Sequence, residues 1–289
     1  MTRRELLGSA MLAGTLPAAA APYPETLGVQ LYTLRSITPK DPRSVLKQLA
    51  AIGYREVETL RPTLREYIPW FKEFGLKPTS GHFDTPLFTG DWTGWDPAPG
   101  YTLDKAIADA KAAGLSYMVV PYVRPEQRGK LDVYKRFAGQ LNKAGEKVHK
   151  AGLGLCYHNH CFEFEPQGSQ RPWDVLMDQT DPKLVGLEMD VFWVVIAGED
   201  PVALLKRYKG RVPLMHLKDV AKGAPKQFNE KVPPATFKEA GSGTLDFVSL
   251  LRAARENGVK HYYVEQDQCP GDPLASVRKS YQFLRGLKV

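Results

Sequence analysis

Four short segments of this sequence end in side chains that can bind a hard divalent metal ion. Each segment ends an apolar, strand-like run, and the four side chains are Glu163, Asp190, His216 and Glu265. Carboxylate oxygens with an imidazole nitrogen suit Mn²⁺, Mg²⁺, Co²⁺ or Zn²⁺ better than a metal that prefers thiolates. One such segment alone would be weak evidence, but the four follow one another in register with strand ends. The sequence therefore predicts one divalent-metal site, with Mn²⁺ as the expected ion.

The segment that contains Glu163 leaves its ligand open. His158 and His160 share one face of an extended strand, and Glu163 follows just beyond the strand. Either His158 or Glu163 could supply the fourth ligand. We expect Glu163, because hard divalent ions prefer carboxylate oxygen. The two histidines would then contact substrate or orient the ligand.

Other polar groups near these strand ends could take part in catalysis or binding. Lys218 lies two residues after His216, so it points the same way and could stabilise an oxyanion or move a proton. The alternative is that Lys218 pairs with Asp219 or a neighbouring carboxylate. Further side chains would suit a polyhydroxylated ligand: Gln30, Tyr32, Arg35, His82, Tyr122, His158 and Trp193.

Strand-like and helix-like runs alternate eight times after Tyr23. The predicted strands are 27–32, 54–59, 76–83, 117–122, 153–160, 184–189, 212–217 and 262–265. Helix-like runs follow at 42–52, 64–74, 103–113, 127–151, 173–179, 201–208, 245–257 and 273–284, with long loops at 84–100 and 221–243. Several helix-like runs stop at a glycine, where a helix C-cap belongs. This pattern predicts one (β/α)₈ TIM barrel over residues 25–289, whose strand ends converge on one mouth. A doubly wound sheet would need a GxGxxG motif, which the sequence lacks.

Composition excludes some classes of protein. The chain has 289 residues and a net charge of +7, but its basic residues are scattered over helix-like stretches, which favours a solvated basic surface over nucleic-acid binding. Its three cysteines form no CxxC pair, so a structural zinc site is not expected. The sequence leaves the oligomeric state open, a homo-oligomer included.

The N-terminus resembles an export signal. Arg3-Arg4 precedes a short apolar stretch and a run of small residues that would suit cleavage near Ala20. The paired arginines are typical of twin-arginine export, which would place the mature protein in the periplasm. We therefore expect residues 1–21 to be a signal peptide and no stable membrane anchor, because the apolar stretch is too short to span a bilayer. A disordered N-terminal arm is the alternative.

Five motifs resemble the sugar phosphate isomerase/epimerase family, whose xylose isomerase-like barrel is related to endonuclease IV. They are Gly28-Val29-Gln30-Leu31-Tyr32-Thr33-Leu34-Arg35, Tyr157-His158-Asn159-His160-Cys161-Phe162-Glu163-Phe164, Asp190-Val191-Phe192-Trp193, His216-Leu217-Lys218-Asp219 and Gly241-Ser242-Gly243-Thr244-Leu245-Asp246-Phe247. The resemblance covers nearly the whole chain after residue 25. It implies a metal set of Glu163, Asp190, His216 and Glu265, with Glu163 and Glu265 also moving the proton. Three positions depart from the family pattern: His158 holds the usual strand-five Glu position, Cys161 a common Asp position, and Trp193 a position where many epimerases have His.

Together these features predict an exported, metal-dependent sugar isomerase or epimerase. It would act on an unphosphorylated sugar or keto-sugar through an enediolate, with Glu163 or Glu265 as base, Lys218 stabilising charge and His160 protonating a leaving oxygen. The expected partner is a small carbohydrate, without nucleic acid. The main alternative is cleavage of a 3-keto-glycoside at the same metal site. Less favoured are an endonuclease IV-like nuclease and a sugar-binding barrel without catalysis.

Overall fold

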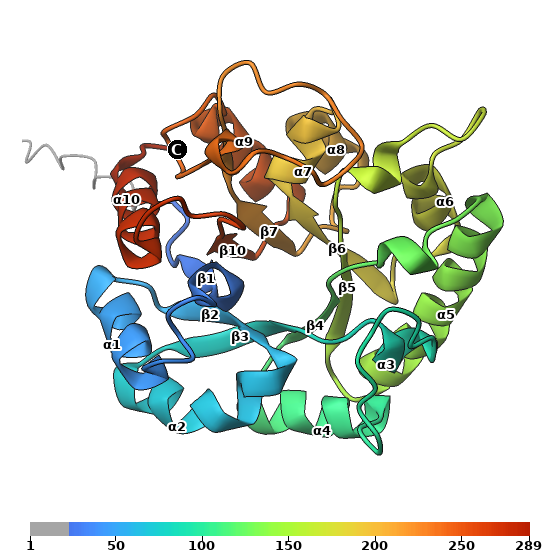
Figure 1. Cartoon of the computed structure of the whole chain (residues 1–289), viewed down its shortest axis with the longest axis horizontal. Helices are drawn as coiled ribbons and strands as arrows, with labels where there is room; N and C mark the ends of the chain where they lie inside the picture. Colours follow the sequence, from blue (N-terminus) through green and yellow to red (C-terminus); the bar gives the residue numbers. More distant parts are fainter. Residues whose placement is uncertain (1–22) are drawn as a thin grey trace, which may run out of the picture.

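The computed structural model describes residues 23–289, which form a closed barrel of eight parallel strands surrounded by helices (Figure 1). The strand order is β1-β10-β7-β6-β5-β4-β3-β2, and β1 pairs with both β10 and β2 to close the barrel. The predicted TIM barrel is confirmed. The predicted signal segment lies outside the described residues.

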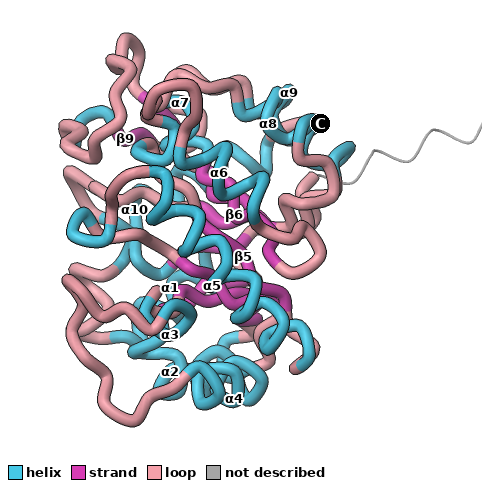
Figure 2. Tube along the Cα trace, turned by 90° about the vertical axis from the view of Figure 1, so that its right-hand side faces the viewer, coloured by secondary structure: helices cyan, strands magenta, loops and turns pink. Residues whose placement is uncertain are grey.

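The barrel strands are short. They are β1 (Gly28–Gln30), β2 (Glu56–Leu60), β3 (Lys77–His82), β4 (Tyr117–Val120), β5 (Gly154–His158), β6 (Val185–Asp190), β7 (Leu214–Leu217) and β10 (His261–Val264). The helices are α1 (Pro42–Ile52), α2 (Leu64–Phe74), α3 (Pro86–Thr89), α4 (Leu103–Ala113), α5 (Leu131–Lys150), α6 (Pro172–Gln179), α7 (Val191–Ile196), α8 (Pro201–Arg207), α9 (Phe247–Asn257) and α10 (Pro273–Gly286). Figure 2 shows the strands inside the ring of helices.

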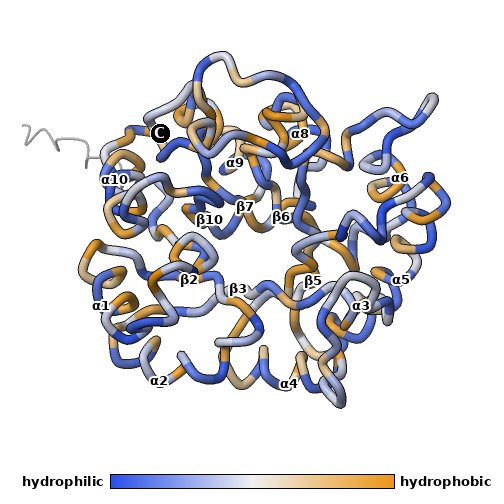
Figure 3. Tube along the Cα trace, viewed as in Figure 1, coloured by the Kyte–Doolittle hydropathy of each residue, from blue (hydrophilic) through white to orange (hydrophobic). Residues whose placement is uncertain are grey.

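The sequence pattern predicts most of these elements closely. Helices α2 and α4 have the predicted bounds, and Gly75 and Gly114 end them in the left-handed conformation that glycine adopts without strain. Hydrophilic and hydrophobic residues are mixed along many of the helices in Figure 3, as is typical of helices that bury one face. Helix α7 was missed, because its residues Val191–Ile196 are almost wholly buried and show no amphipathic period.

The first strand is shorter than the predicted strand 27–32. Strand β1 ends at Gln30, and Leu31–Leu34 form a 3₁₀ helix instead of extending the strand. The side chain of Gln30 accepts a hydrogen bond from the backbone N–H of Tyr32, which caps this short helix. Tyr32 therefore stands on a turn at the barrel mouth and is 41% exposed.

Alternate residues of each strand face the inside of the barrel in layers. A small apolar cluster of Val119, Cys156, Leu214 and Tyr263 fills the interior. Two residues further along three of these strands come His158, His216 and Glu265, all buried. Since side chains repeat their facing every two residues, these three must lie in one layer, nearer the C-terminal strand ends. The fold therefore places these three side chains nearer the barrel mouth than the apolar cluster.

A long segment after β7 lies at the barrel mouth, where its residues Glu230, Val232 and Phe237 line a cavity. It begins with β8 (Asp219–Val220), which pairs antiparallel with β9 (Phe237–Lys238). The buried carboxylate of Asp219 accepts hydrogen bonds from the backbone N–H groups of Val220, Gly241, Gly243, Thr244 and Leu245. This carboxylate ties both ends of the segment together. None of the helices formed by residues 23–289 is long and apolar enough to cross a membrane.

Candidate metal centre and active site

Three of the four predicted ligands meet at the barrel mouth. One ligand atom each from Asp190, His216 and Glu265 lie within 4.8 Å of one another, and all three residues are buried. The Nδ1 atom of His216 is 2.7 Å from Glu265 Oε2 and 3.9 Å from Asp190 Oδ2. Two ligands about 2.1 Å from one ion stand roughly 3–4 Å apart, so the distance to Asp190 fits a divalent ion, and the shorter distance to Glu265 would widen slightly on binding.

His158 stands at the edge of this group. Its Nε2 atom is 3.5 Å from Asp190 Oδ2, and only 3% of the residue is exposed. Asp190 comes from the end of β6 and its backbone is fixed by Asn159, whose side chain accepts from Asp190 N and donates to Asp190 O. Asn159 is the neighbour of His158, so this pair of bonds also holds the end of β5 beside β6.

The residues present fit a metal ion. Asp190 Oδ2 is buried and has no hydrogen-bond partner of good geometry among residues 23–289, although the Lys218 ammonium lies 2.6 Å away. A buried carboxylate oxygen of this kind needs a cation. Burial would lower the pKa of His216, but Glu188, Glu265 and Glu58 together raise it well above its ordinary value. The surroundings therefore attract positive charge, and Asp190, His216, Glu265 and His158 are the residues that could hold the ion.

Lys218 is the internal counter-ion of the centre. Its Nζ atom is 2.6 Å from Asp190 Oδ2, 2.6 Å from Glu265 Oε2 and 3.0 Å from Asp267 Oδ1, and the side chain is 1% exposed. Of the two readings of this lysine, pairing with neighbouring carboxylates is what the geometry shows, with these three residues and not with Asp219. Burial would lower the pKa of Lys218, but these carboxylates raise it well above its ordinary value, so the group is cationic.

Glu163 lies apart from the other three predicted ligands. Its Oε1 atom accepts a hydrogen bond from the Tyr157 hydroxyl at 2.5 Å, and its Oε2 atom accepts one from the His160 backbone N–H at 2.9 Å. Within the described residues it is not part of the group formed by Asp190, His216 and Glu265. It is also not part of the second group of neighbouring ligand atoms, which comes from His82, His158, Glu188 and His216. The preference of hard metals for carboxylate oxygen favoured Glu163, but after β5 the chain forms a 3₁₀ helix (Phe162–Phe164) in which this carboxylate binds Tyr157 and His160 instead. Geometry therefore favours His158 as the ligand from this segment.

This arrangement gives a direct prediction for Glu163→Gln. Burial raises the pKa of Glu163 to about 7, against the hydrogen bond from Tyr157. At pH 4.5 we expect the variant to be less stable by about 1–3 kcal/mol, because an amide has one acceptor oxygen and brings two buried N–H groups, so that one donor of the cluster with Tyr157 and His160 stays unpaired. A raised carboxyl pKa stabilises the fold at low pH and loses that contribution as pH rises through about 7, so the gap between the two proteins should narrow toward neutral pH. Denaturant unfolding of both proteins from pH 4.5 to neutral pH measures this difference in the free energy of unfolding.

The same variant tests whether Glu163 or His158 is the metal ligand from this segment. Glu163→Gln should bind one divalent ion with an affinity within a few-fold of the unmodified chain, whereas His158→Ala should bind it much more weakly. Isothermal titration with Mn²⁺ or Zn²⁺ compares the two. Loss of the metal from Glu163→Gln, with the fold intact by circular dichroism, would restore Glu163 as the ligand.

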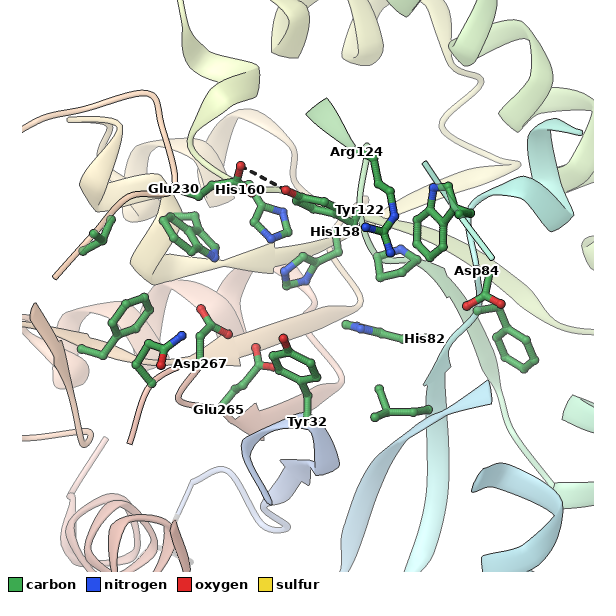
Figure 4. A pocket seen from close by; sticks show the side chains of 18 of the residues that line it. Tyr32, His82, Asp84, Tyr122, Arg124, His158, His160, Glu230, Glu265 and Asp267 are labelled. Atoms are coloured by element: carbon green, nitrogen blue, oxygen red, sulfur yellow. Dashed lines mark hydrogen bonds between the residues drawn. The ribbon is translucent and has the colours of Figure 1, made fainter. Parts of the chain in front are cut away.

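A pocket of about 550 Å³ opens above the centre. Figure 4 shows Glu265, Asp267 and Tyr32 on one side of it, His158 and His160 opposite, and Asp84 with Arg124 further out. The long segment after β7 contributes Glu230, which accepts a hydrogen bond from the Tyr122 hydroxyl at 3.1 Å (Figure 4). Two polar atoms of the residues that line it, His160 Nδ1 and Trp193 Nε1, are buried and have no hydrogen-bond partner in the described part of the chain, so both could contact a ligand.

The predicted binding residues divide into two sets. Tyr32, His82, Tyr122, His158 and Trp193 line the pocket, as does His160. Gln30 and Arg35 are not among the lining residues: Gln30 Nε2 donates to Glu58, and Arg35 stacks on the Tyr32 ring while its guanidinium donates to the backbone carbonyl of Asp267. Both support the wall of the pocket, which differs from the predicted contact with substrate.

Three residues of the site were not predicted from the sequence. Glu58 and Glu188 are fully buried beside the histidines, and Asp267 lines the pocket next to Glu265. A signal was present for two of them, since Glu188 and Asp190 share a strand face, as do Glu265 and Asp267 by the same spacing. Burial raises the pKa of Asp267 to about 6, against Lys218, while Lys218 and His216 overcome burial and hold the pKa of Glu265 well below its usual range.

Known proteins resemble this chain over different spans. An inosose dehydratase from Clostridium perfringens is 31% identical over 162 residues, which cover 53% of this chain and 54% of that protein; one from Lacticaseibacillus casei is 28% identical over 165 residues. The chain thus spans about half the length of these relatives. A sugar phosphate isomerase/epimerase structure from Parabacteroides distasonis ATCC 8503 is 26% identical, with a TM-score of 0.73 over 93% of this chain and 96% of that one.

Two further findings concern the family and the metal. The structure of an IOLI protein with a bound zinc atom shares the fold at 16% identity, with a TM-score of 0.66 over 90% of this chain and 95% of that one. The family model described as "Xylose isomerase-like TIM barrel" matches residues 46–287. The chain therefore belongs to the xylose isomerase-like TIM barrel family.

Proposed function

We propose that this protein is a divalent-metal-dependent lyase that removes a proton beside the carbonyl of a keto-sugar or keto-cyclitol and then expels a β-oxygen. The observation that carries this is the pair Glu265 and Asp267, two carboxyl groups on one pocket wall whose pKa values are pushed in opposite directions. Such divergence is the usual mark of an acid and a base acting together. The names of the partial relatives, inosose dehydratases, support elimination over simple isomerisation.

The residues divide the reaction between them. A divalent ion held by Asp190, His216, Glu265 and His158 would supply a Lewis acid at the substrate carbonyl, which acidifies the neighbouring C–H. Glu265, ionised and facing the pocket, takes that proton, and the C–H electron pair forms the enediolate. Lys218 stabilises the negative charge of the carboxylates around it. The enediolate pair then forms a C=C bond as the β C–O bond breaks, and Asp267 gives its proton to the departing oxygen.

The substrate should carry no phosphate. Of the charged Asp, Glu, Lys and Arg side chains that line the pocket, Asp84, Glu230, Glu265 and Asp267 are acidic and Arg124 alone is basic. The other cation of the lining is His82. Burial would lower the pKa of His82, but Glu58 and Glu188 raise it to about 10, and its charge is already paired with these two carboxylates. A phosphate dianion would therefore meet an excess of negative charge. Hydroxyl groups, in contrast, can donate to the carboxylates and accept from Trp193 Nε1.

The twin-arginine-like segment supports the further proposal that the protein works in the periplasm. A mature protein found only in the cytoplasm with residues 1–21 intact would contradict that.

One experiment separates the candidate reactions. The protein, loaded with Mn²⁺, is incubated in D₂O with keto-cyclitols, 3-keto-glycosides and free sugars, and the products are followed by ultraviolet absorbance and NMR. Elimination gives a conjugated enone and releases water or an alcohol. Isomerisation or epimerisation, the second candidate on the strength of the 26% identical structure named above, gives products of unchanged formula, with deuterium incorporated wherever the base exchanges its proton. No turnover of any of the three classes would contradict the proposal.

A further inference from the structure

Two buried carboxylates lie beneath the metal-binding group, and each is bound to a histidine ring. His216 Nε2 is 2.5 Å from Glu58 Oε2, while its Nδ1 atom faces Glu265. His158 Nδ1 is 3.0 Å from Glu188 Oε2, while its Nε2 atom faces Asp190. Each ring therefore connects a carboxylate inside the barrel with a carboxylate at the mouth.

The two faces of each ring are not equivalent. A neutral imidazole has one N–H and one lone pair, and only the lone pair can bind a metal ion. Glu58 and Glu188 are fully buried and have no solvent to bind, so each requires donors from its neighbours. When a metal ion takes the outer position, the inner nitrogens must therefore carry the protons. That choice leaves the lone pairs of His158 Nε2 and His216 Nδ1 pointing at the mouth.

We propose that Glu58 and Glu188, bridged by His82, are positioning residues that fix the tautomer and orientation of the two histidines which bind the metal. This inference rests on the metal centre of the proposed function. His82 Nε2 is 2.9 Å from Glu188 Oε2 and 3.2 Å from Glu58 Oε2, so this ring joins the two carboxylates. Its ring also stacks against His216 with centroids 5.6 Å apart and planes 11° apart.

Glu188 is the centre of this network. Its Oε2 atom has His82, His158 and His216 nitrogens at 2.9, 3.0 and 3.3 Å. Glu58 is held more firmly by other partners, because Gln30 Nε2 and Ser80 Oγ donate to it at 2.7 and 2.5 Å. Removing the charge of Glu188 therefore releases two metal-binding rings at once, whereas removing that of Glu58 acts mainly on His216.

A second metal ion in the inner group is the competing explanation. Single ligand atoms of His82, His158, Glu188 and His216 also lie within 4.8 Å of one another. However, each of the His158 and His216 rings would then have to bind two metal ions, one through each nitrogen, to remain a ligand of the ion at the mouth. Carboxylates that hold metal-bound histidines by hydrogen bonds are the common arrangement and need no such bridging rings.

The test is Glu188→Gln, which keeps the shape of the side chain but adds an N–H where only an acceptor fits. Metal affinity is measured by titration of the purified full chain with Zn²⁺ and with Co²⁺, and metal content by mass spectrometry. We expect one ion per chain before and after the change, a dissociation constant raised about 10–100-fold, and an altered Co²⁺ absorption spectrum. Glu58→Gln should give a smaller loss and serves if Glu188→Gln does not fold.

Glu56→Gln is the matched control. Glu56 accepts from another imidazole, His261 Nδ1 at 2.9 Å, through a pair of the same kind elsewhere on strands β2 and β10. This variant should leave metal affinity unchanged. Unchanged affinity and spectrum in the folded Glu188→Gln and Glu58→Gln variants would overturn the inference and leave the proposed function standing. Two ions per unmodified chain would overturn it in favour of an inner metal site, and no binding by the unmodified chain would remove the metal centre itself.

Discussion

Glu265→Gln should lose both the metal and the activity. Glu265 Oε2 is one of the three atoms that converge at the mouth, and the same carboxylate faces the pocket where the substrate proton must be taken. An amide binds a hard divalent ion less well and cannot act as a base. We expect metal affinity to fall at least about 100-fold and turnover to fall by about 10⁴ at saturating metal, since base catalysis alone contributes about 10²–10⁴.

Asp267→Asn is the control for that experiment. Asp267 lines the same wall and also contacts Lys218, but it is outside the group of Asp190, His216 and Glu265. It should therefore bind metal normally and lose activity at the proton-donating step alone. Deuterium exchange at the substrate C–H should survive in Asp267→Asn and be absent in Glu265→Gln. Equal metal content in Glu265→Gln and the unmodified chain would exclude Glu265 as a ligand.

The sequence predicted the barrel because each unit repeats the same physical pattern. Buried parallel strands have continuous apolar sequences, and glycines mark where helices end. The strand Tyr117–Val120 and the end of α4 at Gly114 can therefore be predicted without knowledge of any tertiary contact. Asp190, His216 and Glu265 could be predicted for the same reason, since strand ends must converge at one mouth. Their convergence is confirmed by distance.

The positions that the sequence could not predict depend on local turns and long-range contacts. The placement of Glu163 depends on the direction in which the chain leaves β5, and a preference for a ligand type carries no information about that direction. The role of His82 depends on Glu58 and Glu188, which lie on other strands and have no special spacing to it. Partners of this kind become visible only when neighbouring strands are in register, as His158 is beside Glu188.

Lys218→Met should lower turnover far more than it weakens metal binding. The ammonium compensates Asp190, Glu265 and Asp267, and it keeps the pKa values of Glu265 and Asp267 lower than burial alone would set them. Without it both pKa values rise, so ionised Glu265 appears only at higher pH and the acidic limb of the kcat/KM profile moves upward. We expect turnover at neutral pH to fall about 100-fold, the size typical of losing one charge-stabilising contact.

Metal binding should respond differently, because the ammonium and a divalent ion are attracted to the same two oxygens, Asp190 Oδ2 and Glu265 Oε2. Titration of Lys218→Met should give an affinity that is unchanged or higher, since one competing cation is gone. Lys222→Met, an exposed lysine on the segment over the mouth, removes the same charge and should change neither quantity. If Lys218→Met kept normal turnover and an unshifted pH profile, the ammonium would have no part in catalysis. A parallel loss of metal would instead make Lys218 a structural support of the binding group, because the carboxylates would then need it to hold their positions.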